Sequence, residues 1–593
     1  MLSPEWKARV DHWIYKLSEE IHLMSEPCSQ EIVLSQDYTE FLTVALSITP
    51  ELLNLFRGVC YQQIDPRYFT IYTPVNNVNT ISLNQFSYNL FPKLYGEMST
   101  AALEISGITR IASQPVLNLK GQGVLIGIAD SGIDFTHPAF RDAYGRTRIL
   151  RLWDQTDPTG PAPKGISYGT EYTEDDINLA LASSSPSSIV RERDSSGHGT
   201  FLAGVAAGSQ DVTNNFSGAA PESRLIVVKL KPAKNFLRDF YFISPDAAAY
   251  QENDIMLAIN YIRRCASELG LPLSIPFGLG SNLGGHDGYS SLSNIINSTS
   301  RLPGFCITAP TGNEGNSRQH CSGVITDTST PSVIEFSVSP DVPGIFMELW
   351  GQAPALLSIS IQSPTGESTG RIFARPGDFR RFRFIFDRSR ITVYHDLTEF
   401  DVGDEVIVIR IQDPTEGIWK ISAYSNTGYT SYDAYFPGSS MIGENAYFLT
   451  PDPDITLTDP SGADSILSVS GYDPISGAFY PESGRGFTRG GRYKPDICAP
   501  CTAITGPNLH GGYEMRSGTS AASALTGGAC AQLLTWAVTN ENLPLITSSG
   551  IKSLLIRGAT RMPGTSYPSR QWGYGTLDVY NAFEVLRLGG KNL

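Results

Sequence analysis

The sequence predicts an α/β protein in which a parallel sheet flanked by helices is interrupted by an antiparallel β-sandwich (jelly roll) and preceded by a small α/β domain. Short continuous apolar runs such as 124–129 alternate with helical patterns such as 247–268, as expected for buried parallel strands and their crossover helices. Later the pattern changes to strands that alternate apolar and polar residues, separated by turn signals. The predicted domains are 1–97, 98–326, 327–449 and 450–593, the second and fourth forming one α/β domain.

Composition and charge restrict the functions that the chain can have. Of its 593 residues, 41% are hydrophobic and 17% charged, which suits a globular protein with a substantial core. The 44 basic and 59 acidic side chains give a net charge of −15, which argues against nucleic acid as a partner and indicates no basic patch for anionic membranes. No apolar run reaches the length of a membrane span. The N-terminus lacks the pattern of a signal peptide, so we expect either cytoplasmic synthesis and use inside a cell or the loss of a leader.

The first 97 residues mix helical and β-like patterns. Residues 3–22 begin with Ser-Pro, a typical helix start, and continue with apolar residues at helical spacing. Residues 31–34 and 68–72 are β-like, and the stretch 40–56 is helical in character. Helical and β-like patterns are therefore mixed in the segment ahead of the parallel sheet.

Eight cysteines are scattered along the chain, several of them within apolar runs: 28, 60, 265, 306, 321, 498, 501 and 530. This distribution predicts buried free thiols in a reducing compartment. Cys498 and Cys501 form a C-x-x-C pair. Without a second ligand pair, structural thiols are favoured over a redox pair or half of a metal site.

One serine lies in a setting that suits a nucleophile. Ser520 follows the turn 516–519 and precedes an Ala/Gly-rich run through Ala531, which predicts a slim helix against the sheet. A helix N-terminus offers free N–H groups and a positive dipole end to a developing anion. Taken alone, the motif favours an ordinary N-cap serine before a buried helix, and only the residues that accompany Ser520 favour a nucleophile.

A serine nucleophile needs a base, and the base needs an orienting group. His198 lies between two glycines, directly before the small-residue run 201–208, which again indicates a loop entering a buried helix. Asp130 ends the apolar run 124–129 and precedes a glycine turn. In open α/β sheets, ligands bind and catalytic residues lie at the carboxyl ends of the parallel strands. A lone histidine is more often structural, so the combination of motifs carries the prediction.

The order Asp130, His198, Ser520, each in its local context, resembles the subtilisin-like serine proteases, or subtilases. Residues 305–316 resemble the subtilase strand that leads to the oxyanion-hole asparagine, here Asn313. Residues 494–500 resemble the segment upstream of the nucleophile. The resemblance covers roughly 100–330 and 450–585 and implies a serine endopeptidase acting on protein or peptide substrates.

The resemblance also implies substrate-binding residues. Gly278, Leu279 and Gly280 lie where subtilases have the strand that pairs with an extended substrate. Gly312 lies where the family lines its primary specificity pocket. Gly278 stands where the family usually has Ser, so an atypical substrate channel is expected. His137 is expected to be a structural loop histidine and not a second base.

In subtilases a segment ahead of the catalytic domain is an inhibitory propeptide, which implies that residues 1–97 end in the active-site cleft and that self-cleavage falls near 94–99. An N-terminal binding module is the alternative. A β-sandwich insertion without a signal peptide resembles the Csp-type germination subtilases of clostridial spore-formers, which implies a bacterial, spore-associated protein. We expect the sandwich to rigidify the catalytic domain more than it binds substrate, because its strands show no aromatic or charged cluster.

No cofactor is expected for catalysis, and no metal-ligand set stands out. Structural calcium is an alternative for the acidic loops 154–157 and 174–176, where solvated surface is favoured. The expected partners are a protein substrate and the chain's own propeptide. The alternative function is a non-catalytic regulator or scaffold with a subtilase fold, held closed by its propeptide.

Overall fold

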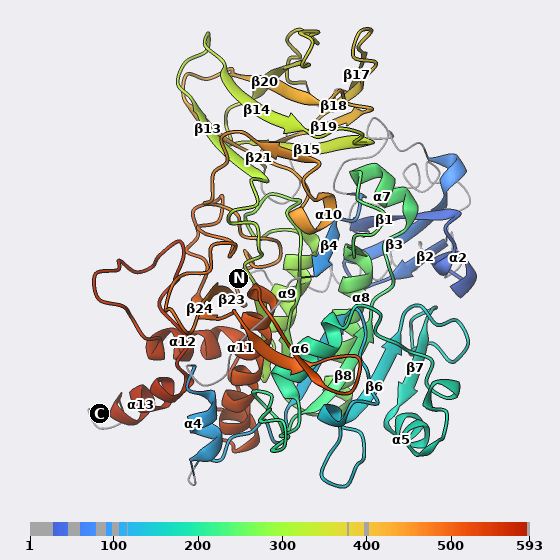
Figure 1. Cartoon of the computed structure of the whole chain (residues 1–593), viewed down its shortest axis with the longest axis vertical. Helices are drawn as coiled ribbons and strands as arrows, with labels where there is room; N and C mark the ends of the chain where they lie inside the picture. Colours follow the sequence, from blue (N-terminus) through green and yellow to red (C-terminus); the bar gives the residue numbers. More distant parts are fainter. Residues whose placement is uncertain are drawn as a thin grey trace, which may run out of the picture.

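The computed structural model describes residues 28–44, 60–78, 90–97, 106–114, 117–375, 379–396 and 403–589. The helix predicted over 3–22 lies outside the described residues. Figure 1 shows three parts: an α/β domain, a sandwich of β-sheets at one end of the long axis, and a small β-domain beside the two.

The α/β domain is built on an eight-stranded sheet in the order β24-β23-β12-β10-β5-β8-β6-β7. All neighbouring strands are parallel except β6 and β7. In β8, alternate residues enter the cores on the two faces, as expected for a strand buried on both sides. The strands are β5 (Leu125–Asp130), β6 (Ile149–Asp154), β7 (Thr170–Thr173), β8 (Arg224–Lys229), β10 (Leu273–Pro276), β12 (Phe305–Pro310), β23 (Leu467–Tyr472) and β24 (Ile497–Pro500).

Helices cover both faces of this sheet. α6 (His198–Ala207) and α11 (Thr519–Leu534) pack against each other on one face, while α8 (Glu252–Leu269) and α9 (Ser291–Ser300) cover the other. Small residues let α11 approach the sheet closely: a Cβ on Gly527 would lie 2.6 Å from the Cβ of Pro276. The other elements are α4 (Ile108–Ser113), α5 (Glu174–Ala182), α7 (Asn235–Tyr241), α12 (Ser548–Gly558), α13 (Val579–Gly589), and the hairpin β25 (Ile504–Pro507) and β26 (Tyr513–Arg516).

The insertion is a sandwich of two antiparallel sheets, with strand orders β13-β21-β15-β19-β18-β17 and β16-β20-β14-β22. Its first strand pairs with β21 and begins at His320, ahead of the predicted boundary at residue 327. The strands are β13 (His320–Ile325), β14 (Ser332–Val338), β15 (Gly344–Gly351), β16 (Leu357–Gln362), β17 (Phe379–Arg383), β18 (Arg390–Asp396), β19 (Glu405–Gln412), β20 (Gly417–Ser425), β21 (Thr430–Tyr435) and β22 (Ala446–Phe448), with the short helix α10 (Ser439–Ile442).

Our expectation that the sandwich strands carry no aromatic or charged cluster is wrong, as is the expectation that the chain has no basic patch. β17 and the turn after it place arginines and aromatic side chains together on an exposed edge. The net charge of −15 is a sum over the whole chain and so gave no indication of this local concentration of arginines.

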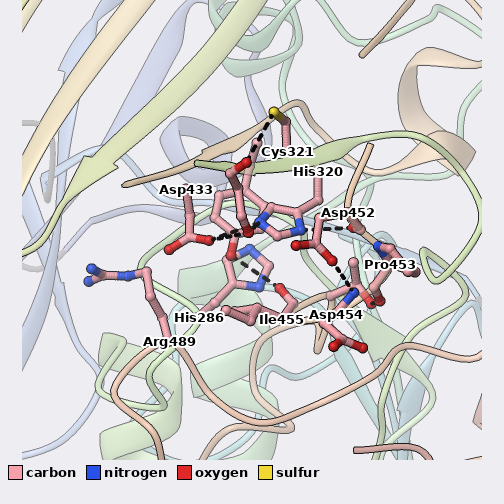
Figure 2. A network of polar contacts seen from close by, with 12 residues as sticks. His286, His320, Cys321, Asp433, Asp452, Pro453, Asp454, Ile455 and Arg489 are labelled. Atoms are coloured by element: carbon pink, nitrogen blue, oxygen red, sulfur yellow. Dashed lines mark hydrogen bonds and ion pairs between the residues drawn. The ribbon is translucent and has the colours of Figure 1, made fainter. Parts of the chain in front are cut away.

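A buried polar network joins the sandwich to the α/β domain (Figure 2). The ring of Tyr435 in β21 stacks between those of His286 and His320, at centroid distances of 3.8 and 4.4 Å. The His320 Nε2 atom lies 3.1 Å from a carboxylate oxygen of Asp433. Burial lowers the pKa of His286 to about 4, which keeps its ring neutral near neutral pH. The loop that contains His286 follows β11 (Leu279–Gly280), so the sandwich supports the segment expected to bind substrate.

The small N-terminal domain is a three-stranded antiparallel sheet, β1-β3-β2, with a short helix. The β-like run 31–34 is helix α2 (Gln30–Leu34), because the Ser29 side chain caps it by accepting from the Ile32 N–H. The stretch predicted to be helical from 40 begins in strand β1 (Tyr38–Val44), where pairing with β3 (Tyr68–Pro74) overrides local preference. β2 is Cys60–Gln63.

Two of the eight cysteines are not free. Cys28 and Cys60 form a disulfide within the N-terminal domain, which corrects the prediction of free thiols throughout. The other six are buried free thiols, as predicted. Burial raises the pKa of both Cys498 and Cys501, so the C-x-x-C pair favours the protonated form.

Candidate active site

Asp130 and His198 form a buried pair at the carboxyl end of the central strand. Asp130 is the last residue of β5 and is 1% exposed, and its Oδ1 atom lies 2.8 Å from His198 Nδ1. The Ser131 N–H donates to the same oxygen at 2.8 Å. Because Nδ1 faces a carboxylate, it is the nitrogen that carries the proton. Nε2 is then the nitrogen whose lone pair can accept a proton from another group.

A second carboxylate, which the sequence analysis did not single out, holds the two loops of this pair together. Asp194 accepts the Ser131 hydroxyl at 2.8 Å and the Gly197 N–H at 2.9 Å on Oδ1. Its Oδ2 accepts both the N–H and the hydroxyl of Thr200. Asp194 therefore fixes the start of α6, where His198 is the first residue. The available signal was an acidic residue directly ahead of a glycine-flanked helix start.

Ser520 comes to the same point from the other end of the chain. It is the second residue of α11 and is fully buried, and its Oγ lies 3.5 Å from His198 Nε2. Gly518, which caps the helix, has φ 145° and turns the chain into it. The aspartate, the imidazole and the hydroxyl therefore form a continuous chain of contacts, with the hydroxyl at the outer limit of hydrogen-bond reach.

Asn313 faces the same point. It follows β12, and its Oδ1 accepts the N–H and the hydroxyl of Thr519, both at 3.1 Å. With the amide oxygen held in this way, the amide NH₂ is the end left to donate. Because Thr519 directly precedes Ser520, these two hydrogen bonds fix the Asn313 side-chain amide close to the serine. The neighbouring Gly312 has φ 89°, and a Cβ there would lie 2.4 Å from Thr458.

The sandwich also reaches this loop, which the sequence did not indicate. The carboxyl group of Glu314, next to Asn313, accepts the Ser439 N–H at 3.0 and 3.1 Å and the Ser439 hydroxyl at 3.0 Å. Burial raises the pKa of Glu314. A cavity of about 700 Å³ opens here, lined by Asn313 and Glu314 together with Ser439 and Tyr447 of the insertion. The insertion therefore forms one wall of the space beside Asn313.

Leu279 and Gly280 form β11, which pairs with a strand from the first part of the chain. In the antiparallel register, Leu279 lies opposite Glu97 and Gly280 opposite Gly96 of β4 (Leu94–Glu97). On its other edge β4 pairs with β9 (Tyr250–Gln251). The backbone edge expected to bind an extended substrate is therefore occupied by the chain's own segment.

Gly278 lies against two side chains that leave little room for a Cβ. A Cβ at this position would lie 2.1 Å from Leu202 Cδ1 and 3.0 Å from Asp130 Oδ2. Contacts this short force neighbouring atoms to move. The bulk of Leu202 in α6 is a physical reason for glycine beside the carboxylate.

Within the described ranges, no group of three or more His, Cys, Asp or Glu side chains is arranged to hold a metal ion. In the same ranges, every helix is too short or too polar to cross a bilayer. His137 accepts the Ala139 N–H through Nδ1 and contacts the Gly512 carbonyl through Nε2.

The fold and this arrangement of side chains define a subtilisin-like serine endopeptidase. The subtilase family model matches residues 121–256 and 445–575. The solved CspB protease of Clostridium perfringens is 30% identical, with a TM-score of 0.73 over 82% of this chain and 98% of that one. The chain therefore belongs to the subtilase family.

Two curated relatives match shorter segments. The membrane-bound transcription factor site-1 protease of Mus musculus is 31% identical over 137 residues, which are 22% of this chain and 12% of that protein. A subtilisin-like protease of Arabidopsis thaliana is 30% identical over 162 residues, which are 24% of this chain and 19% of that protein. The chain thus matches less than a fifth of the length of either relative.

Proposed function

We propose that the chain hydrolyses peptide bonds through an acyl-enzyme on Ser520. His198 takes the hydroxyl proton on Nε2 as Oγ attacks the scissile carbonyl carbon, and then gives that proton to the leaving amine. Asp130 keeps the imidazole in the Nδ1–H tautomer and stabilises the imidazolium. The second half repeats the cycle, with water replacing Ser520 as the nucleophile.

The oxyanion of the tetrahedral intermediate is assigned to two donors, the Asn313 amide and the Ser520 N–H at the start of α11. Donors fixed in advance stabilise charge that develops only in the transition state. The 3.1 Å contacts between Asn313 Oδ1 and Thr519 support this assignment, because they orient the amide before substrate arrives. The 3.5 Å between Ser520 Oγ and His198 Nε2 needs a shift of a few tenths of an ångström, a tightening that substrate binding can supply.

Residues 1–97 are proposed to be an inhibitory propeptide that the chain removes by self-cleavage near 94–99. The observation that supports this proposal is the pairing of β4 with β11, the strand that we propose to bind an extended substrate. Residues 98–105 lie outside the described residues. Limited proteolysis of another protein, in the germination of a spore, is the role implied by the resemblance to Csp-type subtilases and belongs to the same proposal.

Mass spectrometry of the purified chain tests the proposal. The wild-type chain should yield two species whose masses sum to the whole plus one water, whereas Ser520→Ala should give one full-length species. Two matching fragments from Ser520→Ala would assign the cut to another protease. One species from both chains would favour the non-catalytic regulator.

A further inference from the structure

The hairpin formed by β17, its turn and β18 (379–396, the basic hairpin) belongs to a segment charged oppositely to the chain as a whole. Residues 371–390 contain seven arginines and two aspartates, a net charge of 7 − 2 = +5 in a chain of net charge −15. All seven arginines are exposed. Arg390 pairs with Asp413 at 2.6 Å, whereas Arg381, Arg383 and Arg388 have no carboxylate within ion-pair distance in the described part of the chain.

Stability of the sheet does not explain this concentration of charge. In the register of β17 and β18, Arg383 lies directly opposite Arg390, and like charges in that position destabilise a strand pair. β17 is the edge strand of the six-stranded sheet, where charged residues protect against pairing with other chains. Protection alone would not place large apolar side chains in water at the same edge.

Two such side chains lie at the turn of the basic hairpin. Ile385 and Phe386 are each 80% exposed. The carboxylate of Glu367 accepts the N–H groups of Ile385 at 2.9 Å, Phe386 at 2.8 Å and Asp387 at 3.0 Å. Because three successive backbone donors are held by one carboxylate, the turn has a defined shape in which both apolar side chains project outward.

We propose that the basic hairpin docks this protein on the surface of an anionic phospholipid bilayer. Ile385 and Phe386 enter the boundary between headgroups and acyl chains, and the surrounding arginines bind lipid phosphates. A soluble polyanion would match the arginines but leave Ile385 in water, whereas the bilayer interface accommodates both kinds of side chain. Figure 1 places β17 and β18 at the end of the molecule away from α6 and α11, so docking leaves the active site clear of the lipid.

The test is co-sedimentation of the full-length chain, carrying Ser520→Ala to prevent self-cleavage, with phosphatidylcholine vesicles that contain or lack phosphatidylglycerol. Binding should require phosphatidylglycerol and weaken with added salt. Neutralising one arginine should lower the affinity about fivefold, as for basic residues near an anionic surface. Arg383→Gln suits this measurement because it relieves the like-charge pair with Arg390 and should not unfold the hairpin.

The apolar contribution is tested separately with the double variant Ile385→Ser, Phe386→Ser, which should also lose binding. Ile475→Ser is the matched control, since Ile475 is 88% exposed but lies outside the sandwich and should leave binding unchanged. Absence of binding by the parent chain, or equal binding by Arg383→Gln, would overturn the proposal. Binding to heparin without binding to vesicles would also overturn it and assign the hairpin to a soluble polyanion.

Discussion

Removing the carboxylate of Glu40 should loosen the N-terminal domain from the rest of the protein. Glu40 Oε1 lies 3.3 Å from Lys231 Nζ and 2.9 Å from Lys234 Nζ, and Lys231 also pairs with Asp254 at 2.7 Å. All four side chains are buried, so the charges are balanced without water. In Glu40→Ala, Lys234 loses its carboxylate partner.

Breaking a buried ion pair from one side costs about 3–5 kcal/mol. Burial already lowers the pKa of Lys234, so the lysine can shed its proton and the lower figure applies. About 3 kcal/mol corresponds to a roughly 10²-fold smaller equilibrium constant for docking of the N-terminal domain on the rest of the protein. This free-energy cost should weaken the contact between the N-terminal domain and the α/β domain and leave the central sheet as stable as before.

Native-state hydrogen exchange on the full-length Ser520→Ala chain measures this directly. Amides of β1 and β3 should exchange about 10²-fold faster in Glu40→Ala, while those of β5 and β12 keep their rates. Glu31→Ala, an exposed change in the same domain, is the control and should have no effect. Unchanged exchange in β1 and β3, or equal acceleration in the central sheet, would refute the reasoning.

Three further predictions concern single side chains. Gly278→Ser should lower the free energy of unfolding, measured by urea titration, by about 1–3 kcal/mol, because the new side chain clashes with Leu202. Adding Leu202→Ala should restore part of the lost stability. A double variant no more stable than Gly278→Ser would contradict this explanation. Ser439→Ala removes the hydrogen bond from the Ser439 hydroxyl to Glu314 and should lower kcat about fivefold at unchanged KM, which corresponds to about 1 kcal/mol. The exposed Ser440→Ala is the control and should leave kcat unchanged. Equal kcat values for Ser439→Ala and the wild type would refute the prediction. Burial raises the pKa of Glu405 from 4.5 to about 8, so the folded state holds a proton that the unfolded chain releases between these values. Stability should therefore fall by at most about 5 kcal/mol as pH rises through that window, and Glu405→Gln should flatten the slope; a wild-type stability that rises there would contradict the assignment.

The sequence predicted those features that have a local signature. The apolar run 124–129 is the central strand because burial on both faces demands such a run, and the small-residue runs after His198 and Ser520 are the helices that pack on it. The three side chains converge because parallel strands and their following helices present their ends at one edge of the sheet.

Features that depend on distant partners could not be predicted. The contact between Glu314 and Ser439 joins residues 125 positions apart and exists only because the insertion folds back on the active-site loop. The disulfide of Cys28 needs the pairing of β2 and β3 to bring Cys60 close. The arginines of the basic hairpin are present in the sequence, but the negative net charge of the whole chain gives no indication of this local positive charge.

Reaction with a fluorophosphonate tests the central claim most directly, since this reagent needs a serine hydroxyl activated by its neighbours. In chain freed of residues 1–97, peptide mapping should locate one adduct on Ser520, and His198→Ala should prevent it. An adduct that forms equally well without the imidazole, or none at all on Ser520, would contradict the account.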